Sequence, residues 1–218
     1  MVLFASASLQ QIGVISTTAG KAGFITGLYI LVVPIILFLW RHRSATFHEW
    51  IGVAAALSGL YLLSMHGPLT IAPGDSWVLL CAVGFGLHVV MVGEYVRSVD
   101  PYALAFWQFL ITGAASIAVA ISTEPISVTT ITGTWQEILY AGILSAGVGY
   151  TVQSVAQQRT SSVVAGIILS LESVFAVAAG WLILAEELSS RQMTGCTLML
   201  LGTLIAQIPE KQSIAAKG

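Results

Sequence analysis

Long tracts without a charged residue constrain this chain more than any other feature of its sequence. Seven long tracts hold no Asp, Glu, Lys or Arg, and an eighth, residues 160–185, is interrupted only by Glu172. A helix that crosses a bilayer needs roughly 20 largely apolar residues, because the hydrocarbon core is about 30 Å thick and each residue adds about 1.5 Å. The length of these tracts therefore predicts membrane-spanning helices.

Each tract predicts one span, which gives eight spans in all. We place them at about residues 3–19, 22–40, 50–65, 76–96, 102–121, 137–156, 162–184 and 192–208. A membrane β-barrel would alternate apolar and polar residues over strands of about ten, and these continuous apolar runs do not alternate. The predicted fold class is an all-α integral membrane protein.

The composition agrees with a membrane location. Of the 218 residues, 56% are hydrophobic and only 8% are charged, whereas about a quarter of a soluble domain is charged. The lipid bilayer is therefore the first expected partner. The net charge is -2 and no basic run occurs, so we expect no nucleic-acid partner. Cys81 and Cys196 lie in apolar tracts, which indicates small core residues and no disulfide or metal pair.

The basic residues divide unevenly between the two sides that eight alternating spans define. Two of the eight, Lys21 and Arg191, lie on one side. The side with more Lys and Arg in its loops is usually cytoplasmic, so we expect both chain termini in the cytoplasm. The six residues on that side are Arg41, Arg43, Arg97, Arg159, Lys211 and Lys217.

The chain is similar to itself at an offset of 143 residues, where residues 3–65 align with residues 146–208. Each matched part holds three predicted helices, and two further helices, within residues 76–121, precede the second part. Chance similarity between apolar sequences is the alternative explanation. The matching pairs are Gln10 with Gln153, Thr17 with Thr160, Ala22-Gly23 with Ala165-Gly166, Ile25 with Ile168, Leu28 with Leu171, Gly52 with Gly195, Leu57 with Leu200 and Gly59 with Gly202.

A repeat of five helices, an odd number, reverses its orientation in the membrane from one copy to the next. Inverted repeats are typical of secondary transporters, whose substrate site lies between the two halves near the midplane. We predict that this chain forms part of a ten-helix (5+5) inverted-repeat bundle. Residues 1–68 would be the last three helices of the first repeat, residues 74–209 a complete second repeat, and residues 210–218 a cytoplasmic tail.

Several stretches resemble the EamA family of the drug/metabolite transporter superfamily. The resemblance implies two five-helix EamA repeats, no cofactor, and movement of small metabolites, often outward, across the bacterial inner (plasma) membrane. The stretches are "AGFITGLYILVVPIILFLWRHR", "WIGVAAALSGLYLLS", "LHVVMVGEYVRSVDP", "AQQRTSSVVAGIILSLESVFAVAAGWLILAEEL" and "TGCTLMLLGTLIAQI".

The chain departs from the family pattern in two ways. The first two helices of the family are absent, and the usual "LEPVFA" reads "LESVFA" at residues 171–176, with Ser173 in place of proline. Because proline removes a backbone donor and bends a helix, we expect helix 162–184 to be straight.

Glu172 is the most unusual residue in the predicted spans. A charged group at the bilayer centre costs several kcal/mol on insertion scales, so such residues usually face a cavity or a partner. We expect Glu172 to point into the bundle, either in a proton or substrate pathway or in a structural hydrogen bond. Small residues, which let neighbouring helices approach closely, share its helix face: Ala165, Ala176, Ala179 and Gly180.

His88 is the second ionisable residue well inside a span. A functional histidine and a histidine that joins two helices are equally compatible with its sequence context, between Gly86 and Met91. No other histidine lies in a predicted span, so we expect no metal site.

Three glutamines and two aromatic residues complete the candidate set. The glutamine amides would contact a polar substrate or join helices, and Tyr29, the repeat mate of Glu172, would line the same cavity as Trp107. The expected substrate or proton pathway therefore holds Glu172, His88, Gln153, Gln108, Gln10, Trp107 and Tyr29.

The sequence favours one function and leaves others open. The motifs GxxxxGK[ST], HExxH and GxSxG are absent, so we expect no ATP-driven motor and no enzyme; an intramembrane enzyme using Glu172 and His88 is a distant alternative. The favoured function is a secondary transporter, an exporter of a small metabolite or drug-like compound by alternating access. The alternative is a truncated, non-transporting membrane protein or fragment that needs a partner; a homodimer is also considered.

Overall fold

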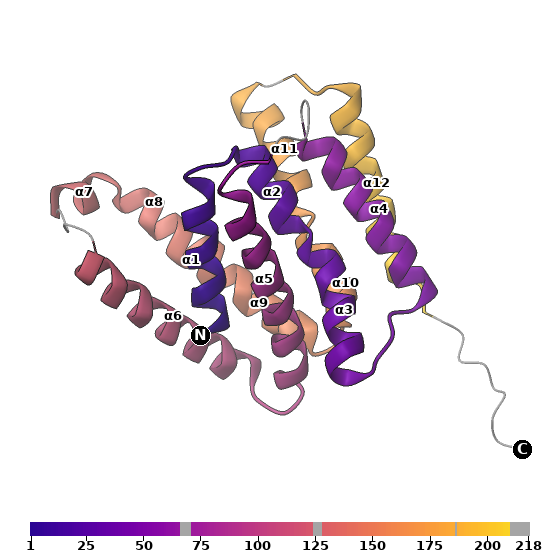
Figure 1. Ribbon diagram of the computed structural model, residues 1–218, viewed down its shortest axis with the longest axis horizontal. Coiled ribbons are helices and arrows are strands. Elements are labelled where there is room, and N and C mark those ends of the chain that lie inside the picture. Colours follow the sequence, from indigo (N-terminus) through magenta and orange to yellow (C-terminus); the bar gives the residue numbers. More distant parts are fainter. Residues whose placement is uncertain (66–70, 124–127, 186, 210–218) are drawn as a thin grey trace, which may run out of the picture.

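The computed structural model of the chain is a bundle of helices (Figure 1). It describes residues 1–65, 71–123, 128–185 and 187–209, and these ranges hold no strand. The all-helical prediction is confirmed. In chain order the elements are α1 (Val2–Val14), α2 (Ala19–Gly27), α3 (Tyr29–Arg41), α4 (Phe47–Ser64), α5 (Asp75–Tyr95), α6 (Pro101–Thr123), α7 (Val128–Gly133), α8 (Trp135–Leu139), the π-helix η1 (Tyr140–Val148), α9 (Gly149–Gln157), α10 (Ser162–Leu169), α11 (Glu172–Leu184) and α12 (Ser190–Ala206).

Five helical segments of the described chain are long and apolar enough to cross a membrane. Helix α1 is apolar but shorter, α12 has 17 residues, and α4 begins with the polar residues His48 and Glu49. Helices therefore occur at all eight predicted positions, but the count of eight spans is not confirmed. The five segments are Ala19–Arg41, Asp75–Tyr95, Pro101–Thr123, Trp135–Gln157 and Ser162–Ile183.

Two of these segments are broken near their middle. The first breaks at Leu28, whose N–H donates to the carbonyl of Ile25 at 3.1 Å, and the second breaks at Ser170 and Leu171. There the hydroxyl of Ser170 donates to the carbonyl of Ile167 at 2.7 Å. A serine hydroxyl that bonds back to its own helix in this way tends to bend it. The expectation of a straight helix 162–184 is therefore wrong, because the interruption needs no proline.

The helix ends recur at the same offset of 143 residues as the sequence matches. The side chains of Thr18 and Ser161 cap the first turns of α2 and α10, and Thr46 and Ser189 form capping boxes at α4 and α12. Each broken helix also ends in a left-handed residue, His42 after α3 and Ala185 after α11. Residues 18–64 and 161–206 therefore share one local design.

Helices α4 and α12 pack against each other through glycines. A Cβ on Gly52 would lie 2.7 Å from the carbonyl oxygen of Gly202, and one on Gly59 would lie 2.5 Å from that of Gly195. The start of α4 thus meets the end of α12, so the two helices are antiparallel. Such close backbone contact is possible only because these positions lack a side chain.

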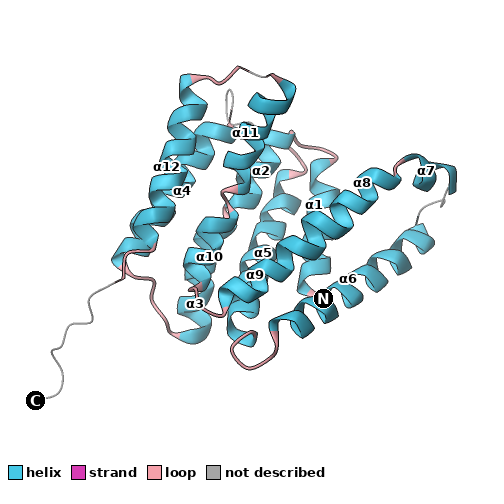
Figure 2. Ribbon diagram, turned by 180° about the vertical axis from the view of Figure 1, so that it is seen from behind, coloured by secondary structure: helices cyan, strands magenta, loops and turns pink. Residues whose placement is uncertain are grey.

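The buried core lies where α3, α4, α5, α10 and α12 meet, and the opposite part of the chain is exposed. Figure 1 shows α6, α7 and α8 on the far side of α1 from α4 and α12. From behind, α9 runs beside α5 and α6 (Figure 2). The largest core side chains include Ile30, Val33, Val53, Leu60, Val90, Ile167 and Met199.

Charged side chains separate to the two ends of the bundle. At one end Arg41 pairs with Glu94 at 2.8 Å, and at the other Lys21 pairs with Asp75 at 2.7 Å. Most predicted cytoplasmic residues lie at the Glu94 end; Lys211 and Lys217, with the predicted tail 210–218, lie outside the described residues.

Candidate functional site

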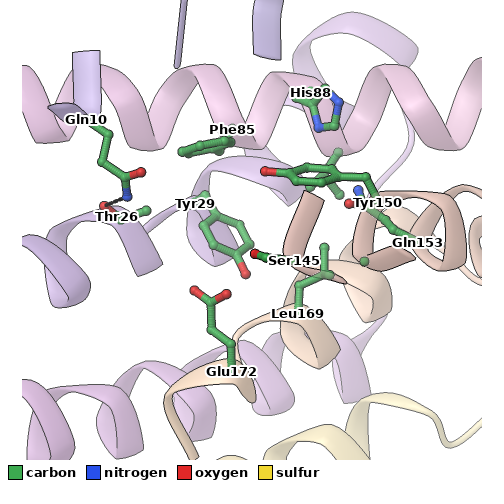
Figure 3. Close-up of a pocket in the computed structure, with 12 residues that line it drawn as sticks. Gln10, Thr26, Tyr29, Phe85, His88, Ser145, Tyr150, Gln153, Leu169 and Glu172 are labelled. Atoms are coloured by element: carbon green, nitrogen blue, oxygen red, sulfur yellow. Dashed lines mark hydrogen bonds between the residues drawn. The ribbon is translucent and has the colours of Figure 1, made fainter. Parts of the chain in front are cut away.

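A cavity of about 260 Å³ lies between the two broken helices (Figure 3). Its walls come from α1, both broken helices, α5 and the η1–α9 segment, so residues far apart in sequence meet there. Aromatic, amide and hydroxyl groups line it together with one carboxyl group. The lining residues are Gln10, Thr26, Tyr29, Phe85, His88, Val89, Ser145, Gly149, Tyr150, Gln153, Leu169 and Glu172.

Glu172 and Tyr29 occupy equivalent places in this cavity. Each is the first residue of the helix that follows a break, and the two are 143 residues apart. In Figure 3 the carboxyl group of Glu172 lies opposite the hydroxyl of Tyr29. The breaks thus place an acid and a phenol at the cavity wall, which the linear pattern of the sequence anticipates only through the repeat.

Two of the predicted glutamines line the cavity and are hydrogen-bonded. Gln10 donates from Nε2 to the hydroxyl oxygen of Thr26 at 3.3 Å. Gln153 donates to the side-chain oxygen of Gln157 at 3.1 Å, and Gln157 donates to the carbonyl of Val89 at 2.9 Å. Gln157 is only 1% exposed, so its contact joins α9 to α5, whereas Gln153 faces the cavity.

His88 is held between a glutamine and a tyrosine. Its Nε2 lies 3.0 Å from Oε1 of Gln108, and its ring meets that of Tyr150 edge-on at 5.7 Å. Gln108 is not among the lining residues, and its Nε2 is buried without a hydrogen-bond partner. Gln108 therefore acts through His88 and has no surface of its own in the cavity.

Trp107 does not join the predicted cluster. Its side chain is 58% exposed and contacts the ring of Phe106, on a helix that packs little against the core. Only one residue separates it from α6 residues that do face inward, so helix rotation alone decides its position.

The structure adds residues that sequence reasoning did not select. Tyr150 lies three positions before Gln153 on the same helix face, a spacing that would have indicated it. Ser145 lies in η1, a π-helix rich in glycine, and π-helical turns are frequent at functional sites. Nothing in the sequence predicted that turn. No group of three or more His, Cys, Asp or Glu suited to a metal occurs in the described part of the chain.

The family follows from the sequence match. Residues 72–207 match the EamA-like transporter family. The chain belongs to this family. The match confirms the resemblance inferred from the sequence and indicates a multi-pass membrane protein of a transporter family, not an enzyme.

Three curated relatives agree with this assignment. An uncharacterized transporter from Archaeoglobus fulgidus is 34% identical over 94% of this chain and 66% of its own length. An uncharacterized transporter from Synechocystis sp. is 25% identical over 76% of this chain and 50% of its length. A chloroplastic WAT1-related protein from Arabidopsis thaliana is 26% identical over 91% and 50%. The chain thus spans between half and two thirds of these relatives.

A solved structure shares the fold. A crystal structure with 19% sequence identity superposes with a TM-score of 0.81 over 94% of this chain and 72% of the other chain. At this identity the likeness concerns the arrangement of helices alone.

Proposed function

We propose that this chain forms the substrate pathway of a secondary transporter that exports a small metabolite or drug-like compound by alternating access. The observation that carries the proposal is the meeting of Glu172 and Tyr29 at the two helix breaks, inside one cavity. Discontinuous helices near the midplane commonly build the substrate and ion sites of such transporters.

The cavity suits a small amphipathic compound with hydrogen-bonding groups. At about 260 Å³ it is slightly smaller than the roughly 300–1,000 Å³ of sites for drug-sized ligands, which favours a small metabolite. The rings of Phe85 and Tyr150 offer apolar contact, and the amides of Gln10 and Gln153 offer hydrogen bonds. Glu172 would hold a proton or a cationic group of the substrate.

We propose the inverted-repeat topology for the whole transporter. In this arrangement all eight helical segments span the membrane, residues 1–68 and 74–209 belong to successive repeats, and the end with Arg41, Arg43 and Arg159 faces the cytoplasm. Support comes from the antiparallel packing of α4 on α12 and from the recurring breaks and caps. The membrane would be a prokaryotic plasma membrane, with both termini in the cytoplasm.

A second candidate is a fragment that transports only with a partner. Helices α1 and α3 pack against α5, and their repeat mates α9 and α11 would need an equivalent helix before the first repeat. On α11 the large apolar side chains of Phe175, Trp181 and Ile183 are exposed. Two upstream helices of the same kind, or a second copy of the chain, would cover that face.

One experiment tests transport and separates the two candidates. The chain alone, and the chain preceded by the two upstream helices of a longer relative, are placed in liposomes, and efflux of a panel of labelled amino acids, amines and organic acids is measured. Flux by both proteins supports a self-sufficient transporter, and flux by the longer protein alone supports a fragment. No flux of any solute above that of empty liposomes contradicts the transporter proposal.

A further inference from the structure

The cavity is closed at the end of the bundle where α4 and α10 begin, which we call the Glu49 end. Gln157 joins α9 to the backbone of α5 there, and a Cβ on Gly93 would lie 2.3 Å from the hydroxyl of Ser162. Helix α10 also packs against α3 and α4. Parts of both repeats are thus in close contact at this end.

A buried carboxylate holds the contact together. One oxygen of Glu49 accepts from the backbone N–H of Thr46 at 2.8 Å, and the other accepts from the hydroxyl of Ser161 at 2.5 Å. The same hydroxyl oxygen of Ser161 accepts from the N–H of Val164 at 3.1 Å and so caps α10. Glu49 is 8% exposed and links the first turns of two helices that are 112 residues apart in sequence.

The equivalent residues at the opposite end are not joined. The repeat mates of Glu49 and Ser161 are Gln192 and Thr18. Gln192 accepts from its own cap residue Ser189, and Thr18 accepts from the N–H of Lys21; both lie in the described part of the chain, where no hydrogen bond joins them. Helix α2 likewise does not pack on α11 to the extent that α10 packs on α3.

We propose that the hydrogen bond from Ser161 to Glu49 is a latch that keeps the cavity shut at the Glu49 end while the opposite end gives access to it. In the switched state this bond breaks, and Thr18 bonds Gln192 instead. The inference rests on the alternating access proposed above, because two inverted repeats can exchange their conformations between the two states. Glu49 and Ser161 act as positioning residues and do not touch the substrate.

Thiol labelling from each side of the membrane tests the latch without a substrate. Leu169, which lines the cavity, is replaced by cysteine in a chain whose Cys81 and Cys196 are alanine. A membrane-impermeant thiol reagent is then applied to inside-out and to right-side-out vesicles. In Ser161→Asp the aspartate retains the helix cap but repels Glu49. We expect labelling from the Glu49 side to rise several-fold relative to unmodified Ser161.

The repeat mate supplies a matched control. Thr18→Asp keeps the cap of α2 in the same way but meets no acidic partner, so labelling from the Glu49 side should not change. Adding Glu49→Gln to Ser161→Asp restores a donor–acceptor pair and should return labelling towards the starting rate. Equal labelling in Ser161→Asp and Thr18→Asp, or no recovery in the double variant, overturns the latch.

Two further comparisons keep the test decisive. If Ser161→Asp does not fold, Ser161→Ala is compared with Thr18→Ala, and the same difference between the two is expected; equal rates would overturn the proposal. A latch that fails while efflux persists leaves the transporter proposal intact. Changed labelling in a chain without efflux supports the latch and counts against the transporter proposal alone.

Discussion

An acidic side chain inside a membrane protein must be hydrated, paired or protonated, because the hydrocarbon interior solvates no charge. Glu172 meets this requirement by lining a cavity together with Tyr29 and two glutamines. His88 meets the equivalent requirement differently, through Gln108 and the ring of Tyr150. The two ionisable residues therefore have different roles: Glu172 faces the cavity with no hydrogen-bonding partner fixed by the described chain, whereas His88 joins α5 to α6.

The pair of His88 and Gln108 gives a prediction at this scale. Gln108→Leu leaves Nε2 of His88 without its partner, and an unmade buried hydrogen bond costs about 1–3 kcal/mol. Adding His88→Leu removes the unpaired group, so the double variant should lose less stability than the sum of the two single variants. Denaturation in detergent measures this. Strictly additive losses would show that the two side chains do not interact.

At the scale of elements, the broken helices and the glycine contacts determine the site. The breaks bring Tyr29 and Glu172 to the cavity, and the contact of α4 with α12 fixes the axis around which both broken helices pack. The chain has other glycines that touch nothing. This contrast permits a matched test of the α4–α12 contact.

Gly59→Ala should destabilise the protein, whereas Gly113→Ala should not. A Cβ on Gly59 would lie 2.5 Å from the carbonyl oxygen of Gly195, while no atom lies within 4 Å of one on Gly113. The first substitution must separate α4 from α12; the second gains up to about 1 kcal/mol of helix propensity. Melting temperatures in detergent decide the matter. A loss at Gly113 equal to that at Gly59 would contradict the packing described here.

The sequence predicted the positions of the helices well and their interruptions poorly. Charge-free tracts mark each helical segment because exclusion of charge from lipid acts on every residue. The break at Ser170 depends on a hydroxyl bonding back to the helix, and η1 depends on packing around glycines, so neither follows from hydropathy. The repeat did place Glu172 opposite Tyr29, but a helix face could not be assigned to Trp107 without the packing of α6.

At the scale of the whole molecule, the two ends of the bundle differ in charge. Arg41 and Arg43 lie near Glu94, together with Arg97 around one small cavity, whereas Lys21 lies with Asp75 at the opposite end. An excess of Lys and Arg favours retention in the cytoplasm. The direction of the cavity opening in the cell depends on this orientation.

Reporter fusions test the orientation. A fusion at Gly218 should give a cytoplasmic signal and one after Pro73 an external signal, because the six basic residues of one side outnumber the two of the other. Fusions at both sites must be expressed to similar levels for the comparison to hold. External signal at Gly218 with cytoplasmic signal at Pro73 would reverse the proposed direction of transport.

The most direct measurement compares proton-driven transport by the wild type, Glu172→Gln and Glu172→Leu in liposomes, using the longer protein if the chain alone gives no flux. Glutamine keeps the size and hydrogen-bonding capacity of Glu172 but cannot release a proton. If Glu172 is the proton or substrate site, Glu172→Gln melts within a few degrees of the wild type but loses transport driven by a proton gradient. Full gradient-driven transport by Glu172→Gln would show that the carboxyl group is a structural hydrogen-bonding group and would contradict its role in the pathway.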